Sequence, residues 1–97
     1  RQGRRFDIIV LDPPTFSRDE KGHVWRVEKD YDHLVNLAAA CLAPHGRILC
    51  STNCRKLTMP AFRRMVAAGI PGAQLISVPM TFDFDGEDYL KCIWAIT

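Results

Sequence analysis

The sequence has no apolar run that approaches the ~20 residues that a membrane-spanning helix requires. It also shows no basic-then-apolar leader, so nothing in it points to secretion, and we expect no membrane partner. Thirteen Lys and Arg against eleven Asp and Glu leave a formal net charge of +2. Bulk charge therefore favours no particular class of partner.

What is present is the composition of an ordinary globular domain. Apolar residues make up 47% and charged residues 25% of the 97 positions, which excludes a disordered tail, a collagen-like rod and a disulfide miniprotein. The chain opens with Arg1, without an initiator Met, and enters a strand almost at once. We therefore expect residues 1–97 to form a single partial domain of a longer protein.

The four cysteines are Cys41, Cys50, Cys54 and Cys92. The closest pair has three residues between its members, not the two of a zinc knuckle, and no His follows at ligand spacing, so we predict no metal site. Two disulfides in a secreted domain are allowed by the count alone. The composition favours reduced thiols in a cytoplasmic protein.

Four short apolar runs predict strands at residues 6–11, 47–51, 75–78 and 90–96. The first is nearly all apolar, which is typical of a parallel strand buried on both faces. Pro79 follows the third run and cannot donate a ladder hydrogen bond, so that strand should lie at a sheet edge. Asp85 and Gly86 indicate a turn before the last strand.

Two amphipathic helices are predicted between these strands. The first is capped by Asp30, carries apolar residues through Leu42, and ends at residues 44–46. The second is capped by Thr58 or Met59, has Pro60 in its first turn, and ends at Gly69. Residues 17–29 show little periodicity and are interpreted as a long loop, a kind of segment that is usually functional or disordered.

The resulting order is strand, helix, strand, helix, strand, strand, which predicts a mostly parallel α/β sheet whose last strand is antiparallel. Ligands of such sheets bind outside the carboxyl ends of the parallel strands. If the first two strands are neighbours, residues 12–17 and 52–55 share that edge, and Asp12 and Asn53 open into one cleft.

The strongest motif, at residues 12–17, reads Asp-Pro-Pro-Thr-Phe-Ser. Two prolines fix φ and remove two N–H donors, so carbonyls and the Asp12 carboxylate are held stiffly as acceptors. With Phe16 beside them, these acceptors suit a planar ring that carries N–H groups, such as a nucleobase. The alternative is a strand-terminating turn in which Phe16 fills a gap in the core.

The run FDIIVLDPPTFS at residues 6–17 resembles the fourth strand and fourth motif of class I S-adenosylmethionine-dependent methyltransferases. It is most similar to the bacterial methyltransferases of large-subunit ribosomal RNA, and the similarity continues through residues 28–30, 45–49 and 51–53. The resemblance implies the C-terminal, substrate-side half of a Rossmann-like sheet, with two crossover helices. In the family's order 3-2-1-4-5-7-6, the four predicted strands are equivalent to 4-5-7-6.

The resemblance also implies what the chain does not contain. The family's glycine-rich cofactor loop follows its first strand, and its ribose-binding acid follows the second. No Gly-x-Gly occurs in the chain. We therefore expect S-adenosylmethionine to need residues upstream for its full site, and the 97 residues to be inactive by themselves.

Residue roles follow from the same resemblance. Asp12 would orient the acceptor base or the sulfonium end of the cofactor, Pro13 would offer its carbonyl, and Pro14 completes the catalytic run. The candidate RNA-binding residues are Phe16, Arg18, Trp25, Asn53 and Arg55. In relatives that methylate amino groups the aromatic residue directly follows the two prolines, whereas here Thr15 intervenes. Core packing for Phe16, a sheet-covering position for Trp25, and solvated surface for the arginines are the alternatives.

The expected activity is methyl transfer to ribosomal RNA as part of rRNA processing, with a guanine nitrogen favoured and cytosine C5 second. Cytosine-C5 enzymes use a thiolate from this loop region, and ungapped alignment puts that position at Asn53 rather than Cys54. The alternatives are a non-catalytic α/β RNA-binding domain and a methyltransferase with a non-RNA substrate. An apolar strand 6–11 left at a sheet edge also predicts a homodimer.

Overall fold

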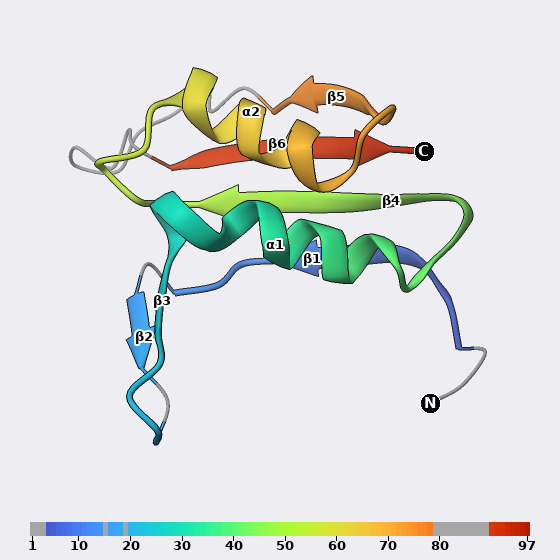
Figure 1. The fold of residues 1–97 in the computed structure, drawn as a ribbon. Helices are drawn as coiled ribbons and strands as arrows, with labels where there is room; N and C mark the ends of the chain where they lie inside the picture. The colour runs from blue at the N-terminus through green and yellow to red at the C-terminus, as the bar shows by residue number, and fades with distance from the viewer. Residues whose placement is uncertain (1–3, 15, 19, 79–89) are drawn as a thin grey trace.

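The computed structural model of the chain describes residues 4–14, 16–18, 20–78 and 90–97, and forms a sheet with two helices and a small hairpin (Figure 1). None of the helices in these residues is long and apolar enough to cross a membrane. The elements in chain order are β1 Phe6–Leu11, β2 Phe16–Arg18, β3 Val24–Arg26, α1 Val27–Ala39, β4 Leu42–Thr52, α2 Met59–Gly69, β5 Gln74–Ser77 and β6 Lys91–Ile96.

The main sheet has four strands in the order β1-β4-β6-β5. β1 and β4 are parallel, whereas β6 is antiparallel to both β4 and β5. This is the order 4-5-7-6 with an antiparallel last strand, so the predicted α/β topology is confirmed. β5 lies at the edge as predicted, although Pro79 and the turn predicted at residues 85–86 lie outside the described residues.

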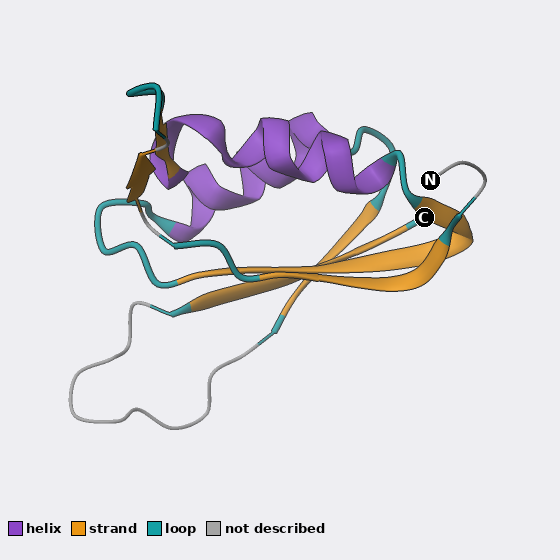
Figure 2. Ribbon diagram, turned by 90° about the horizontal axis from the view of Figure 1, so that it is seen from below, coloured by secondary structure: helices purple, strands orange, loops and turns teal. Residues whose placement is uncertain are grey.

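The core lies between the sheet and the helices, both of which cover the same face (Figure 2). On α1 the buried residues Val27, Tyr31 and Val35 recur at steps of four, which is the spacing of one helical face. They meet side chains that alternate along the central strands, where every second residue faces the helices. The strand residues of this core include Ile48, Cys50, Ile93 and Ala95.

β1 is buried on one face only, so the prediction of a strand buried on both faces is wrong for the described residues. Ile9 and Leu11 pack against the core. Phe6, Ile8 and Val10 point to the other face and are 47%, 58% and 62% exposed. The reason is that both helices cover one side of the sheet.

Residues 17–29 do not form the predicted loop. β2 and β3 pair as an antiparallel hairpin, and α1 begins at Val27. The helix is capped at Arg26 rather than at Asp30, whose carboxylate instead accepts a hydrogen bond of 2.9 Å from the Arg26 backbone N–H. The helix starts a turn earlier because Val27 lies on the same buried face as the next core residues of α1.

The connection from α1 to β4 also differs from the prediction. The helix ends at Ala39, and β4 starts at Leu42 instead of residue 47. Phe6 lies opposite Leu42 and Ile8 opposite Arg47, so the extra residues of β4 bulge out of the ladder. His45 has a positive φ of 66° in this bulge. The Pro-His-Gly run therefore bends a strand and does not end a helix.

α2 follows its prediction. Thr58 is the N-cap and its Oγ1 accepts a hydrogen bond of 3.3 Å from the Ala61 N–H, with Pro60 in the first turn. The helix ends at Gly69, where it comes close to α1. A Cβ at Gly69 would lie 2.5 Å from the backbone O of Asp32 and 2.7 Å from the Cβ of Val35. Gly69 is thus needed for the contact between the helices.

We expect Gly69→Ala to destabilise the chain. Alanine improves helix propensity by at most ~1 kcal/mol, whereas overpacking against a fixed backbone costs ~1–3 kcal/mol. The expected net loss in the free energy of unfolding is up to about 2 kcal/mol, measured by urea denaturation. Ala67→Gly, at an exposed position of the same helix, is the control and should lose only the propensity difference. A gain in stability for Gly69→Ala would contradict the close packing of α1 on α2.

Candidate functional site at the carboxyl edge of the parallel strands

The carboxyl ends of β1 and β4 lie side by side. Leu11, the last residue of β1, is paired with Cys50 of β4. Asp12 directly follows β1, and Asn53 directly follows β4. Their loops therefore leave the sheet at the same edge, as the strand order predicted from the sequence requires.

Hydrogen bonds join the two strand ends beneath these loops. The Ser51 hydroxyl donates to the Leu11 carbonyl oxygen at 3.0 Å. The Tyr31 hydroxyl, which comes from α1, lies 2.9 Å from the Ser51 carbonyl oxygen. These contacts fix the backbone from which Asp12 and Asn53 project.

The first loop presents a carboxylate to the outside. Asp12 and Pro14 are exposed, and Pro13 is half-buried between them. Burial and, second, the Asp12 carboxylate raise the pKa of the Cys92 thiol. Asp12 thus places a negative charge at this edge, which suits a cationic or N–H-bearing ligand.

The second loop, which follows β4, exposes one of its first two side chains and buries the other. Asn53 is exposed, whereas Cys54 is 3% exposed and belongs to the core. The Cys54 N–H donates to Thr52 Oγ1 at 3.2 Å. The Cys54 carbonyl oxygen accepts a hydrogen bond of 3.0 Å from the Lys91 ammonium group. Of these two residues, Asn53 has the accessible side chain at this edge.

The four cysteines form no disulfide in the structure. Burial raises the pKa of Cys50 to about 12, so this thiol stays protonated at neutral pH. Cys50 is a core residue of β4, the strand that runs between β1 and β6. It is therefore a packing residue and not a nucleophile.

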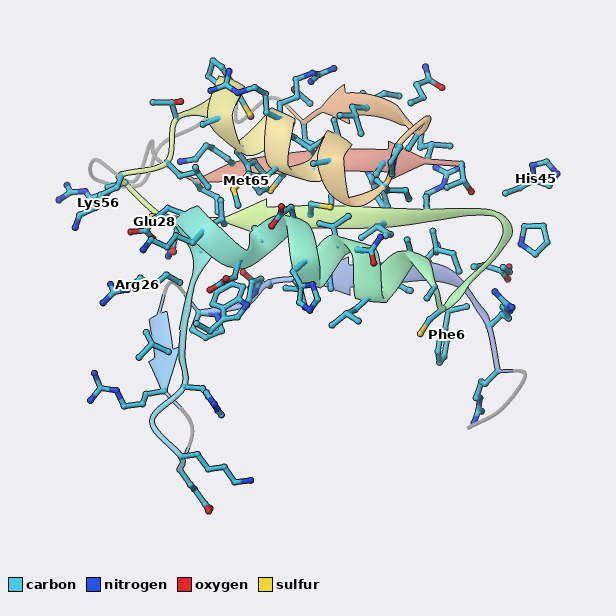
Figure 3. The ribbon with its side chains drawn as sticks, in the orientation of Figure 1. Phe6, Arg26, Glu28, His45, Lys56 and Met65 are labelled. Atoms are coloured by element: carbon cyan, nitrogen blue, oxygen red, sulfur yellow. The ribbon has the colours of Figure 1, made fainter. Side chains whose placement is uncertain are left out.

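The hairpin projects from the same end of the sheet (Figure 1). Trp25 is half-buried and packs against the core, which fits the sheet-covering alternative. Figure 3 shows Arg26 of β3, Glu28 of α1 and Lys56 of the loop after β4 at this end, far from His45. The exposed cationic side chains in this region are Arg18, Lys21, Arg26, Arg55 and Lys56.

The structure thus brings together most of the predicted site residues at one edge. Asp12, Pro13 and Pro14 lie in one loop, and Asn53 and Arg55 lie in the other. The remaining candidates are on the hairpin. Of these, Arg18 is exposed, Trp25 is turned partly toward the core, and the side chain of Phe16 lies outside the described residues.

Tyr31 and Lys91 are two residues of this edge that sequence analysis missed. Tyr31 is one turn into α1 on its buried face, where a phenol needs a polar partner. Lys91 begins β6 opposite Thr52 and is 8% exposed. Burial lowers the pKa of Lys91, and the neighbouring Cys54 opposes that shift. The antiparallel register of β6 against β4 brings Lys91 to this edge, and no local sequence pattern reveals that register.

A separate open hollow of about 560 Å³ lies at the opposite edge of the sheet. It is lined by residues that include Arg5, Leu42, Ile70 and Thr97. These residues lie at the starts of β1 and β4 and at the ends of α2 and β6, away from Asp12 and Asn53. The hollow therefore does not belong to the site formed by the strand ends.

No family model matches the chain. Among curated proteins, it is 35% identical over 98 residues to the ribosomal RNA large subunit methyltransferase K/L of Pseudoalteromonas atlantica, and the match covers 100% of this chain and 14% of that protein. It is 43% identical over 60 residues to the protein of the same name from Chromohalobacter salexigens, which covers 61% of this chain and 8% of that protein. The chain therefore spans a small part of these relatives.

Among solved structures, the chain resembles SMU.776, described as a putative methyltransferase complexed with SAH. The TM-score is 0.78 at 28% sequence identity, and the match covers 97% of this chain and 27% of that one. These findings confirm the predicted resemblance to S-adenosylmethionine-dependent methyltransferases and the predicted fold class. The chain corresponds to part of a Rossmann-like methyltransferase fold.

Proposed function

We propose that the chain forms the substrate-side part of an S-adenosylmethionine-dependent enzyme that methylates a base of large-subunit ribosomal RNA in the cytoplasm. The observation that carries this proposal is the position of the Asp-Pro-Pro run. It directly follows β1 at the edge where the exposed Asn53 follows β4. The names of the curated relatives support an RNA substrate.

The residues at this edge fit one part of a cofactor site. The exposed Asp12 carboxylate complements a sulfonium cation, and the chain offers no Gly-x-Gly turn for the rest of the molecule. When bound, S-adenosylmethionine would supply an electrophilic methyl group. We propose that the complete cofactor site includes residues outside these 97, and that the chain by itself is inactive.

Methyl transfer from a sulfonium requires alignment of the donor with the acceptor more than it requires acid–base catalysis. The methyl donor would supply its methyl group to the acceptor nitrogen and leave as a neutral thioether, and the proton of that nitrogen would pass to solvent water at the exposed Asp12 edge. Asp12 would accept an N–H of the base and hold the acceptor in line, with the stiff Pro13 carbonyl as a second acceptor. Pro14 keeps this segment extended. Fixed alignment of this kind supplies a large part of the rate.

We favour a guanine nitrogen as the target, with cytosine C5 second. A covalent cytosine-C5 mechanism needs an accessible thiolate, whereas Cys54 is 3% exposed and its neighbour Asn53 is exposed. The amide of Asn53 is suited to a hydrogen bond with the edge of a base. The orientation of Asn53 and Cys54 thus supports nitrogen methylation.

The RNA backbone would meet the hairpin and the loop after β4. Arg18 and Arg55 are exposed on these segments and can contact phosphate groups. We propose Phe16 and Trp25, which belong to the same hairpin, as stacking partners for unpaired bases. Since Trp25 also packs against the core, only the exposed part of its ring is open to RNA.

The test of the function is Asp12→Asn in the intact protein, with single-turnover methylation of ribosomal RNA as the measurement. Because Asp12 is exposed and not part of the core, we expect the melting temperature to stay close to that of the wild type. We expect methyl transfer to fall by at least ~10-fold because the amide lacks the negative charge of the carboxylate and therefore aligns the base and the methyl donor less firmly.

The matched control for Asp12→Asn is Asp7→Asn, which removes an exposed carboxylate from β1, the strand that precedes Asp12, away from the site. This control should retain the wild-type rate. If Asp12→Asn also retained it, Asp12 would have no part in the reaction. If the wild-type protein bound RNA without methylating it, a non-catalytic RNA-binding domain would replace the proposed enzyme.

We also propose that the 97-residue chain forms a homodimer through β1. This strand lies at one edge of the sheet and pairs with β4 on its other side. Its exposed apolar side chains are Phe6, Ile8 and Val10. Edge strands of this kind pair with other chains unless charge, proline or a covering segment prevents it.

Sedimentation of the chain and two variants tests the dimer. Val10→Lys places a charge on the exposed face of β1, whereas Ile9→Lys is unsuitable because Ile9 packs against the core. The control is Ile76→Lys, which charges a 43% exposed residue of β5 at the other edge. We expect the wild type and Ile76→Lys to dimerise and Val10→Lys to be monomeric. A wild-type chain that stays monomeric at high concentration would contradict the proposal.

A further inference from the structure

Tyr31 connects α1 to the ends of both parallel strands. Its side chain is fully buried, and its hydroxyl oxygen lies 2.9 Å from the carbonyl oxygen of Ser51 and 3.4 Å from that of Leu11. Leu11 immediately precedes Asp12, and Ser51 lies two residues before Asn53. The phenol thus reaches the backbone of both segments that form the site.

The geometry determines how this hydroxyl acts. A phenol has one proton to donate, so the 2.9 Å contact with Ser51 is the main hydrogen bond and the 3.4 Å contact with Leu11 is secondary. The Leu11 carbonyl oxygen has a closer donor in the Ser51 hydroxyl, at 3.0 Å. Tyr31 therefore holds the backbone of Ser51, and the side chain of Ser51 holds the backbone of Leu11.

The aromatic ring of Tyr31 has a fixed position in the core. It packs edge-on against Phe62 of α2, with 5.0 Å between the ring centroids and 85° between the planes. Burial raises the pKa of Tyr31 above its usual range, so the hydroxyl remains a donor at neutral pH. A phenylalanine would fill the same volume without the cost of burying a hydroxyl. The hydroxyl therefore contributes the strand contacts rather than packing.

We propose that Tyr31 is a positioning residue for methyl transfer. Its hydroxyl, acting through Ser51, sets the separation of the loop that carries Asp12 from the loop that carries Asn53. An acceptor held between these loops is thereby aligned with the methyl donor. This inference rests on the proposed function of the edge, and it adds a residue from the helix layer to the strand-end residues.

The expected effect of Tyr31→Phe on the rate can be estimated because methyl transfer, a displacement reaction, requires aligned reactants. A misplacement of ~1 Å in an active site can reduce the rate by about 100-fold. Loss of one hydrogen bond beneath the loops should produce a smaller shift. We therefore expect Tyr31→Phe to lower kcat by about 10-fold, with the KM for RNA little changed, because the exposed RNA-binding residues are untouched.

The experiment compares Tyr31→Phe and Ser51→Ala with Val66→Ala in the intact protein. Val66 is also fully buried, but it lies on α2 and makes none of the side-chain hydrogen bonds at the strand ends. Two quantities are measured: kcat and KM for methylation of ribosomal RNA, well below the melting temperature, and hydrogen–deuterium exchange of the backbone amides at residues 51–54.

We expect Tyr31→Phe and Ser51→Ala each to lower kcat and to speed exchange at residues 51–54. Val66→Ala should lower the melting temperature while leaving both quantities at wild-type values. Wild-type kcat and exchange in Tyr31→Phe would overturn the inference. An equal fall in kcat for Val66→Ala at a matched loss of stability would also overturn it, because the effect would then be one of stability alone.

The two proposals fail in distinguishable ways. If the wild-type protein transfers no methyl group to RNA, the proposed function fails, and the exchange measurement still decides on Tyr31. Faster exchange in Tyr31→Phe but not in Val66→Ala would support its positioning of the strand ends. Unchanged exchange would overturn that role whether or not the protein is an enzyme.

Discussion

The parallel pairing of β1 with β4 is the constraint on which the rest of the structure depends. Because Leu11 lies beside Cys50, the segments that follow the two strands leave the sheet at one edge. α1, which connects these strands, covers one face and brings Tyr31 to their ends. A change in this register would separate Asp12 from Asn53 and disconnect both from the helix layer.

The sequence predicts those parts of the fold that depend on local signals. Thr58 and Pro60 mark the start of α2, and alternating or continuous apolar runs mark the strands of the main sheet. The hairpin was missed because strands of three residues are too short to show a periodicity. The bulge at His45 was missed because proline and glycine in sequence usually indicate the end of an element rather than a bend within a strand.

The candidate site also contains residues that the sequence predicts and residues that only the structure reveals. Asp12 and Asn53 were identified because strand order alone determines which loops share an edge. Tyr31 and Lys91 were not, since their roles depend on contacts between residues distant in sequence: a helix hydroxyl with Ser51, and an ammonium group with the Cys54 carbonyl oxygen. The structure was also needed to show that only one face of the sheet is covered, because the apolar sequence of β1 does not reveal which of its faces the helices cover.

The central claim is that these residues hold the acceptor side of a methyltransferase site, whereas most contacts to the methyl donor come from elsewhere in the polypeptide. Isothermal titration of S-adenosylhomocysteine into the 97-residue chain and into the intact protein tests this claim most directly. The claim predicts micromolar binding by the intact protein and none at that level by the chain alone. Micromolar binding by the isolated chain would contradict it.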